Sequence, residues 1–415
     1  MKQNDYFQKS QYPFLSASFD LHNTPPGEID YRIKHLKKGM MDRGLDALLI
    51  IQKMDVYYFS GTTQDGVLFV PVDHQPILFV KREICRAEAE SALDTIIEFQ
   101  SIKEIPKRLD DFNLPSPKTI GLELDVLPAN DYFKIKKLFP PSRLSDASKI
   151  IRDIRKTKSP YELECMKNAG RIGERTYVEG IKHLKEGISE IEFGGMLERE
   201  AKKLGSEGLL RVRSMNYEAY SWHILAGPTG GIVSQSDSPM GGLGLSPAFP
   251  VGASRRPIQA NEPIVVDFGT CSQGYQADET RTFCIGELPK KFLDAYEACD
   301  EIHNAVLSET RPGVHCEYLF ELSVKTAKKL GYEENYLGPP GLQTRFVGHG
   351  IGLELNEFPF LAKGHSYELE EGMTFALEPK IVFPGEGAVG IENTVYVNRD
   401  GYEFVTPLEN RLFVV

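Results

Sequence analysis

The sequence lacks the cysteine pairs, long apolar runs and apolar leader that are typical of disulfide-rich, membrane and secreted proteins. The 415 residues include six cysteines, and none of them form a CxxC pair. This low density argues against a disulfide scaffold, so we expect reduced thiols and a cytoplasmic location. No stretch approaches ~18 continuous apolar residues, so we expect no transmembrane helix. The chain begins MKQNDYFQKS, without the apolar core that a secretion signal requires.

The net negative charge of the chain excludes some classes of binding partner. Acidic residues outnumber basic ones by 59 to 48, the formal net charge is −11, and no strong basic block offsets this excess. We therefore expect neither nucleic acid nor a membrane surface as a partner. A dinucleotide-binding domain is also excluded, because no GxGxxG motif follows the first predicted strand.

The remaining features divide the chain into three parts, since its length exceeds that of one typical domain. Residues 1–28 are polar and contain prolines, which indicates an N-terminal extension. Residues 29–147 alternate helical and strand patterns and predict an α/β domain without a catalytic motif of its own. Residues 148–415 mix long helices with hairpins, and Ser159–Pro160 is a typical helix start.

Five potential metal ligands lie in the C-terminal third, each in a stretch that reads as a strand or strand edge. Four carboxylates and one imidazole form an oxygen-rich set, which suits a pair of divalent ions better than one structural zinc ion. Ordinary surface acids are the alternative. It fits poorly because the apolar runs PIVV and MTFAL precede two of the acids, and unpaired buried carboxylates are costly. The five residues are Asp267, Asp278, His349, Glu378 and Glu392.

A first hairpin is predicted around the turn at residues 272–274. Its strands, Ile264–Thr270 and Tyr275–Phe283, are rich in valine, tyrosine, threonine and phenylalanine. A turn centred between positions 272 and 273 would set Asp267 directly opposite Asp278. Side chains opposed in this way emerge on one face about 5 Å apart, near enough to share a metal site.

A second hairpin is predicted across the sequence FPGEG. It pairs Thr374–Val382 with Ala388–Val397 about Gly385, and this register sets Glu378 opposite Glu392. Two hairpins that each offer a carboxylate pair to one cavity would account for four of the five ligands.

As a set, the motifs VVDFG, GYQADETRTF, GHGIG, LEPK and GIENT resemble those of the pita-bread metallopeptidases, in the branch of Xaa-Pro aminopeptidases, prolidases and creatinases. The resemblance covers nearly the whole chain beyond about residue 30. It implies an α+β protein with a creatinase-like N-terminal α/β domain and a C-terminal pita-bread catalytic domain. By position, it implies Asp267 as the bidentate ligand of one metal, Asp278 and Glu392 as bridging carboxylates, and His349 and Glu378 as completing the second metal.

The chain departs from this family at positions that contact the peptide. A histidine that follows a glycine-rich segment in the family corresponds to Ser234 here. A His-Glu pair after the GHGIG turn is Asn356-Glu357, and an arginine two residues before the last glutamate is Gly390. The chain thus has the residues that the resemblance implies as metal ligands, but it differs at the positions that would bind the scissile peptide and its carboxylate.

The resemblance implies a dinuclear hydrolase, with a hydroxide bridging two divalent ions, that cleaves short Xaa-Pro peptides as an aminopeptidase or dipeptidase. Manganese is the expected metal, and cobalt, iron and zinc are alternatives. Glu378 is the expected proton shuttle, while His223 and Asn356 could replace the missing histidines. Two readings stay open: a metal-dependent hydrolase or lyase for a non-peptide, amide-like small molecule, and a binding protein on an inactive peptidase fold. A homodimer is expected from the resemblance.

Overall fold

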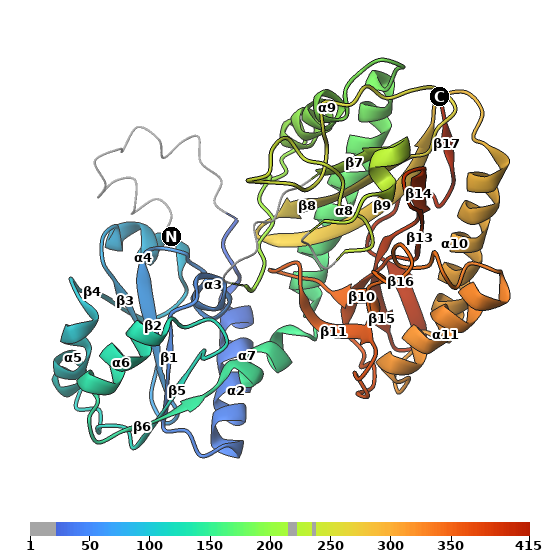
Figure 1. Cartoon of the computed structure of the whole chain (residues 1–415). Coiled ribbons are helices and arrows are strands. Elements are labelled where there is room, and N and C mark those ends of the chain that lie inside the picture. Colours follow the sequence, from blue (N-terminus) through green and yellow to red (C-terminus); the bar gives the residue numbers. More distant parts are fainter. Residues whose placement is uncertain (1–21, 215–221, 235–237) are drawn as a thin grey trace. The chain divides into compact units, whose positions relative to one another are not determined.

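The computed structural model describes residues 22–214, 222–234 and 238–415. The chain divides into two compact units, Met1–Ile154 and Arg155–Val415 (Figure 1). Most of the predicted N-terminal extension, up to residue 21, lies outside the described residues. Within the part that the structure describes, no helix has the length and apolar character needed to cross a membrane.

The first unit contains a six-stranded sheet in the order β4-β3-β2-β1-β5-β6. The pairs β1–β2 and β2–β3 are antiparallel, and the pairs β3–β4, β1–β5 and β5–β6 are parallel. The mixed sheet fits the predicted alternation of helices and strands. Its strands are β1 (Ala47–Ile50), β2 (Gly66–Pro71), β3 (Ile77–Val80), β4 (Thr95–Glu98), β5 (Thr119–Leu122) and β6 (Arg143–Asp146).

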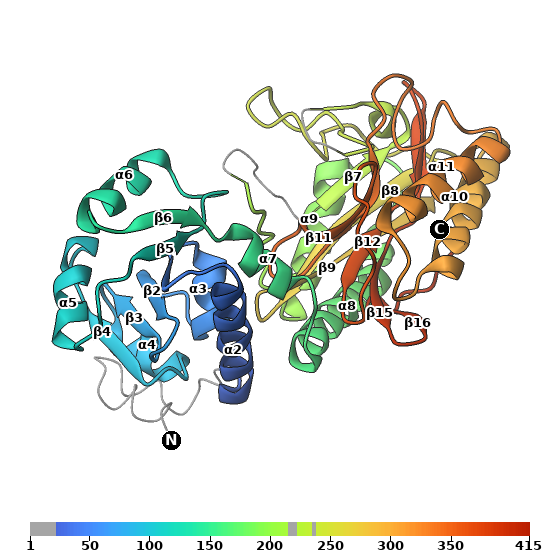
Figure 2. The ribbon, with the colours of Figure 1, turned by 90° about the horizontal axis from the view of Figure 1, so that it is seen from below.

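Helices cover both faces of this sheet, with α5 and α6 on one face and α2 and α3 on the other (Figures 1 and 2). Ile105 and Leu109 of α5 and Ile135 of α6 pack into one apolar core with strand residues such as Phe79. The burial of these side chains stabilises the unit. The helices are α2 (Pro26–Asp42), α3 (Lys53–Ser60), α4 (Ile84–Glu90), α5 (Ile105–Asp111), α6 (Ala129–Leu138) and α7 (Ser148–Arg155).

The second unit places helices on two sides of its strands (Figures 1 and 2). Helices α8 (Pro160–Gly180) and α9 (Glu190–Lys203) share a core with β7 (Trp222–Ala226), β8 (Ile264–Ser272), β9 (Tyr275–Cys284) and β17 (Phe413–Val414). The predicted start of α8 is confirmed, because Ser159 and Glu162 form a capping box around Pro160.

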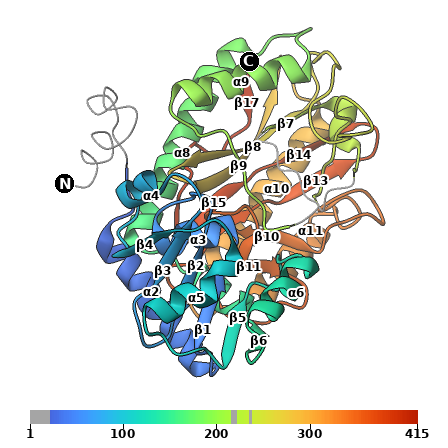
Figure 3. The ribbon, with the colours of Figure 1, turned by 90° about the vertical axis from the view of Figure 1, so that its left-hand side faces the viewer.

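The other helices of this unit, α10 (Lys290–Glu309) and α11 (Cys316–Lys329), pack on the remaining strands. A five-stranded sheet has the order β11-β10-β12-β15-β16, and β13 and β14 form a two-stranded ribbon. Strand β14 lies beside β8 and β9 (Figure 3). The strands are β10 (Phe346–Gly350), β11 (Glu357–Ala362), β12 (Thr374–Leu377), β13 (Lys380–Phe383), β14 (Gly387–Gly390), β15 (Asn393–Asn398) and β16 (Gly401–Phe404).

The first predicted hairpin exists as β8 and β9, but its predicted register was wrong. Asp267 stands opposite Thr280, and Asp278 stands opposite Gly269. The reason is the turn, which consists of Gln273 and Gly274, both with positive φ, as in the two-residue turns that favour hairpin twist. The register differs from the predicted one by two positions, so Asp267 and Asp278 still lie on one face of the hairpin.

The register of the second predicted hairpin is confirmed, although the hairpin is divided into two parts. Strand β13 pairs with β14 nearest the turn, and β12 pairs with β15 beyond it, in one continuous register. Glu378 and Glu392 lie opposite each other at the break between the two ladders. The Glu378 N–H donates to the carbonyl of Val347 at 2.9 Å, and the Glu392 N–H donates to the carbonyl of Thr280 at 3.1 Å. These bonds connect the break to β10 and β9.

Candidate metal centre

Three of the five predicted ligands form a compact group in the second unit. Asp278 on β9, His349 on β10 and Glu392 beside β15 each offer one ligand atom, and these atoms lie within 4.8 Å of one another. All three residues are buried. Two carboxylates and an imidazole are a donor set that divalent transition metals accept. The group therefore fits one divalent ion, and no second group of this kind exists in the part of the chain that the structure describes.

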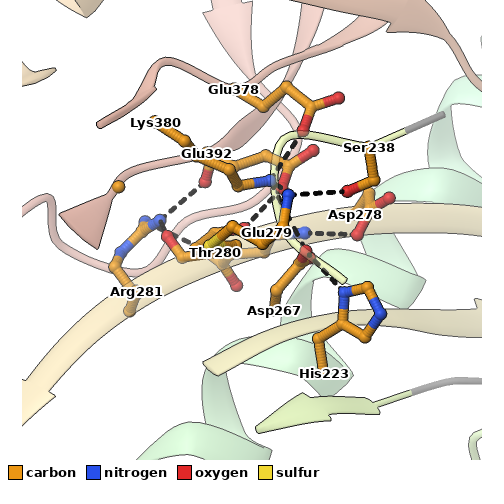
Figure 4. Close-up of polar contacts among 12 residues, drawn as sticks. His223, Ser238, Asp267, Asp278, Glu279, Thr280, Arg281, Glu378, Lys380 and Glu392 are labelled. Carbon is orange, nitrogen blue, oxygen red and sulfur yellow. Dashed lines mark hydrogen bonds and ion pairs between the residues drawn. The ribbon is translucent and has the colours of Figure 1, made fainter. Parts of the chain in front are cut away.

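The other two predicted ligands, Asp267 and Glu378, border this group but are joined to a different partner. Lys380 Nζ lies 2.6 Å from Glu378 Oε2 and 3.4 Å from Asp267 Oδ2 (Figure 4). It also lies 3.2 Å from Glu392 Oε2. The ammonium of Lys380 therefore joins the two outlying carboxylates to the ligand group.

Sequence reasoning missed Lys380, although a signal was present. Residues two apart in extended backbone project to the same face, so a lysine two positions after the predicted ligand Glu378 is expected to point toward the same site. Because lysine is almost never fully buried unless it is paired, the sequence alone favours a surface position. In the structure the side chain is only 1% exposed.

Burial and charge set the protonation of this cluster. Burial raises the pKa of Asp278 to about 7, and the neighbouring charge of Asp267 adds to this shift. Burial also raises the pKa of Glu392 well above its usual range, although Lys380 opposes the shift. For Asp267, burial acts upward, but Lys380 and His223 outweigh it and hold the pKa of its carboxyl well below the usual range. The site is thus short of positive charge, which a divalent ion would supply.

The candidate ligands are held by hydrogen bonds with neighbouring side chains. Thr280 Oγ1 donates a hydrogen bond to Glu392 Oε2 at 2.5 Å. The buried guanidinium of Arg281 donates to the carbonyl oxygen of Glu392 at 2.7 Å. Thr394 Oγ1 accepts from the Asp278 N–H at 2.9 Å. Such outer contacts fix ligand orientation before a metal binds.

The structure places His223 beside the site. It lies on β7 directly opposite Asp267, and its Nδ1 is 3.5 Å from Asp267 Oδ2 (Figure 4). An imidazole at this point can donate to a carboxylate or to a bound substrate. The position agrees with the prediction that His223 supplies an imidazole to the site, and that role stays a prediction.

The other replaced positions are occupied as follows. Ser234 Oγ donates to the carbonyl of Pro250 at 2.5 Å. Asn356 is partly buried immediately before β11, and its catalytic role stays a prediction. Its neighbour Glu357 pairs with Lys158 at 2.9 Å and with Arg155. Burial acts to raise the pKa of Glu357, but these two cations lower it to about 2.

Comparisons with known proteins agree with this architecture. Residues 164–399 match Metallopeptidase family M24, and residues 32–157 match the Creatinase/Prolidase N-terminal domain. The chain belongs to Metallopeptidase family M24, and its fold is the predicted combination of a creatinase-like N-terminal domain and a pita-bread catalytic domain. Membership of this family implies divalent metal ions.

Individual relatives extend the match over most of the chain. The Xaa-Pro dipeptidase of Pyrococcus furiosus is 27% identical over 387 residues, covering 92% of this chain and 99% of the relative. The Xaa-Pro dipeptidase of Lactobacillus delbrueckii is 27% identical over 395 residues, covering 92% and 98%.

Solved structures show the same fold. The prolidase of Pyrococcus horikoshii superposes with a TM-score of 0.77 at 25% identity, covering 91% of this chain and 99% of that chain. The X-Pro aminopeptidase of Thermotoga maritima has a TM-score of 0.77 at 24% identity, covering 91% and 100%. The fold of both units is therefore that of prolidase-like enzymes.

Proposed function

We propose that this protein is a metal-dependent peptidase that cleaves short Xaa-Pro peptides. The observation that carries the proposal is the buried group of Asp278, His349 and Glu392, whose ligand atoms lie within 4.8 Å of one another. These residues stand in the motifs through which the chain resembles the family. The relatives named Xaa-Pro dipeptidase, which match over nearly their whole length, support the substrate class.

The ligand group would hold a divalent ion, which when bound polarises a carbonyl and lowers the pKa of a water molecule. The residues of the chain do the rest. Glu378 takes a proton from the attacking water and returns it to the leaving amine. Lys380 holds its Oε2 at 2.6 Å, and its Oε1, 3.6 Å from His349 Nε2, faces the ligand group. His223 and the amide of Asn356 donate hydrogen bonds to the peptide carbonyl as negative charge develops there.

Three further features belong to this proposal. Manganese is the metal that we propose, since an oxygen-rich site with one imidazole accepts it readily. A homodimer follows from the resemblance to the prolidase branch. A cytoplasmic location follows from the cysteine usage of the sequence.

The test is hydrolysis of matched peptide pairs by manganese-reconstituted protein of measured metal content. We expect Ala-Pro and Ala-Pro-Ala to be cleaved faster than Ala-Ala and Ala-Ala-Ala, and we expect His349→Ala to abolish both rates. Fully metallated protein that cleaves none of these peptides would overturn the proposal. Small amides and elimination substrates would then be tested, because Ser234, Asn356 and Gly390 replace the residues that bind peptide in the family.

A further inference from the structure

Lys380 is a cation built into the metal centre. Its side chain is 1% exposed, and its Nζ contacts Asp267, Glu378 and Glu392 at 3.4, 2.6 and 3.2 Å. A buried ammonium is tolerated only where carboxylates or other acceptors compensate for its loss of water. Here it has three carboxylate partners, all of them predicted metal ligands.

The five predicted ligands fall into two sets by position. Asp278, His349 and Glu392 form the group that fits an ion. Asp267 and Glu378 stand outside that group, and each is paired with the Lys380 ammonium. A second divalent ion would need Asp267 and Glu378 as its ligands, so it would compete with the Lys380 ammonium that already pairs with both.

We propose that Lys380 takes the place of one of the two metal ions, so that this protein binds a single divalent ion, at Asp278, His349 and Glu392. This inference rests on the metal dependence in the proposed function and is independent of the peptide substrate. Lys380 acts as a positioning residue, because it holds Asp267 and Glu378 beside the ion without ligating it.

Gly390 shows how the fold accommodates this lysine. Gly390 is the direct partner of Lys380 in the β13–β14 ladder, and a Cβ on Gly390 would lie 2.5 Å from Lys380 Cγ. Thr282 Oγ1 accepts from the Gly390 N–H and donates to its carbonyl, so the glycine backbone is fixed. The absence of a side chain at Gly390 therefore leaves the space that the Lys380 side chain occupies.

The loss of the lysine charge is expected to admit a second ion. Without Lys380, Asp267 and Glu378 would lose their cationic partner in a buried site, and unpaired buried carboxylates are strongly unfavourable. A divalent ion can then bind to the same oxygen atoms. Lys380→Gly and Lys380→Met both remove the charge, while Lys380→Arg keeps it.

The experiment counts manganese ions per chain, by elemental analysis after equilibrium dialysis and by calorimetric titration. We expect one ion in wild type and in Lys380→Arg, two ions in Lys380→Gly and Lys380→Met, and none in His349→Ala. Lys291→Met is the matched control. Lys291 is 45% exposed and pairs with Glu386, so this variant should bind one ion. Circular dichroism checks that each variant is folded.

Wild-type protein that binds two ions, or none, overturns the inference, and this count requires no variant to fold. A lysine-free variant that folds and still binds one ion also overturns it. The outcome is separable from the proposed function. One bound ion without peptide cleavage would support this inference and overturn the substrate class. Two bound ions with peptide cleavage would overturn this inference and support the substrate class.

Discussion

Lys380 and Gly390 face each other across the β13–β14 ladder so closely that a Cβ on Gly390 would lie 2.5 Å from Lys380 Cγ. The contact is made at the root of the lysine side chain, where little freedom exists to move aside. The position of the buried ammonium thus depends on a glycine ten residues away in the sequence.

Gly390→Ala is expected to lower the free energy of unfolding by about 1–3 kcal/mol, the usual range for overpacking. In a Lys380→Gly background the clash with the lysine side chain is gone, so the same substitution should cost at least ~1 kcal/mol less. A double-mutant cycle by urea denaturation measures the difference. Gly195→Ala, where no heavy atom lies within 4 Å of the added Cβ, is the additive control. Equal costs of Gly390→Ala in both backgrounds would show that the two residues do not share this space.

Asp278→Asn and His349→Ala each remove a member of the ligand group, and we expect each to weaken manganese binding by more than ~100-fold, because even outer contacts cost 10–100-fold. Calorimetric titration measures the affinity. His315→Ala is the control, because the His315 side chain is 55% exposed. This variant should bind manganese with wild-type affinity. Unchanged manganese affinity in either ligand variant would remove that residue from the site.

Thr280→Val removes the hydrogen bond to Glu392 while preserving the shape of the side chain, and we expect manganese affinity to fall about 10–100-fold. Thr326→Val is the matched control, because Thr326 on α11 bonds to the backbone carbonyl of Leu322 and not to a residue of the site. The same titration compares the two variants. Equal affinities would mean that Thr280 does not orient Glu392.

His303, on α10, makes the free energy of unfolding depend on pH. It is fully buried and stacks on Phe404. Within the described residues neither ring nitrogen has a hydrogen-bond partner. Burial lowers its pKa to about 3, and the nearby charge of Arg281 contributes. The unfolded chain protonates this imidazole near pH 6.5, whereas the folded chain keeps it neutral down to about pH 3. Stability is therefore lost as the pH falls between these values.

His303→Phe should remove this contribution, which is about 1.4 kcal/mol per pH unit where the unfolded histidine is charged. Urea denaturation between pH 7 and 4.5 measures the slope, which should be smaller in the variant than in wild type. His315→Phe changes an exposed histidine and is the control. An identical slope in His303→Phe and wild type would contradict the neutral, buried state of His303.

The candidate metal ligands could be found from the sequence because they lie in strands or directly beside them, where local signals are present. The second hairpin has a recognisable turn about Gly385, so its register followed directly. The first hairpin was misaligned because Gln273, a non-glycine residue, adopts positive φ, which favours a turn one position later. The strands and the helix start at Ser159 follow from periodicity and capping.

Lys380 could not be predicted in the same way. Its burial depends on β8, β13 and β15 meeting around one point, and β8 is separated from the other two by more than 100 residues of sequence. A lysine beside a ligand reads as an exposed charge until the carboxylates that surround it are placed. His223 was a candidate from its closeness in sequence to a missing histidine, yet only the pairing of β7 with β8 sets it opposite Asp267.

The most direct test of the central claim is the rate of Ala-Pro hydrolysis as manganese is added to metal-free protein, with bound metal measured in the same samples. A metal-dependent Xaa-Pro peptidase with Lys380 in place of one ion predicts no hydrolysis without metal and a plateau at one ion per chain. A plateau at two ions per chain would contradict the proposed role of Lys380 but not the peptidase activity. Hydrolysis by metal-free protein, or none at any metal content, would contradict the proposed function.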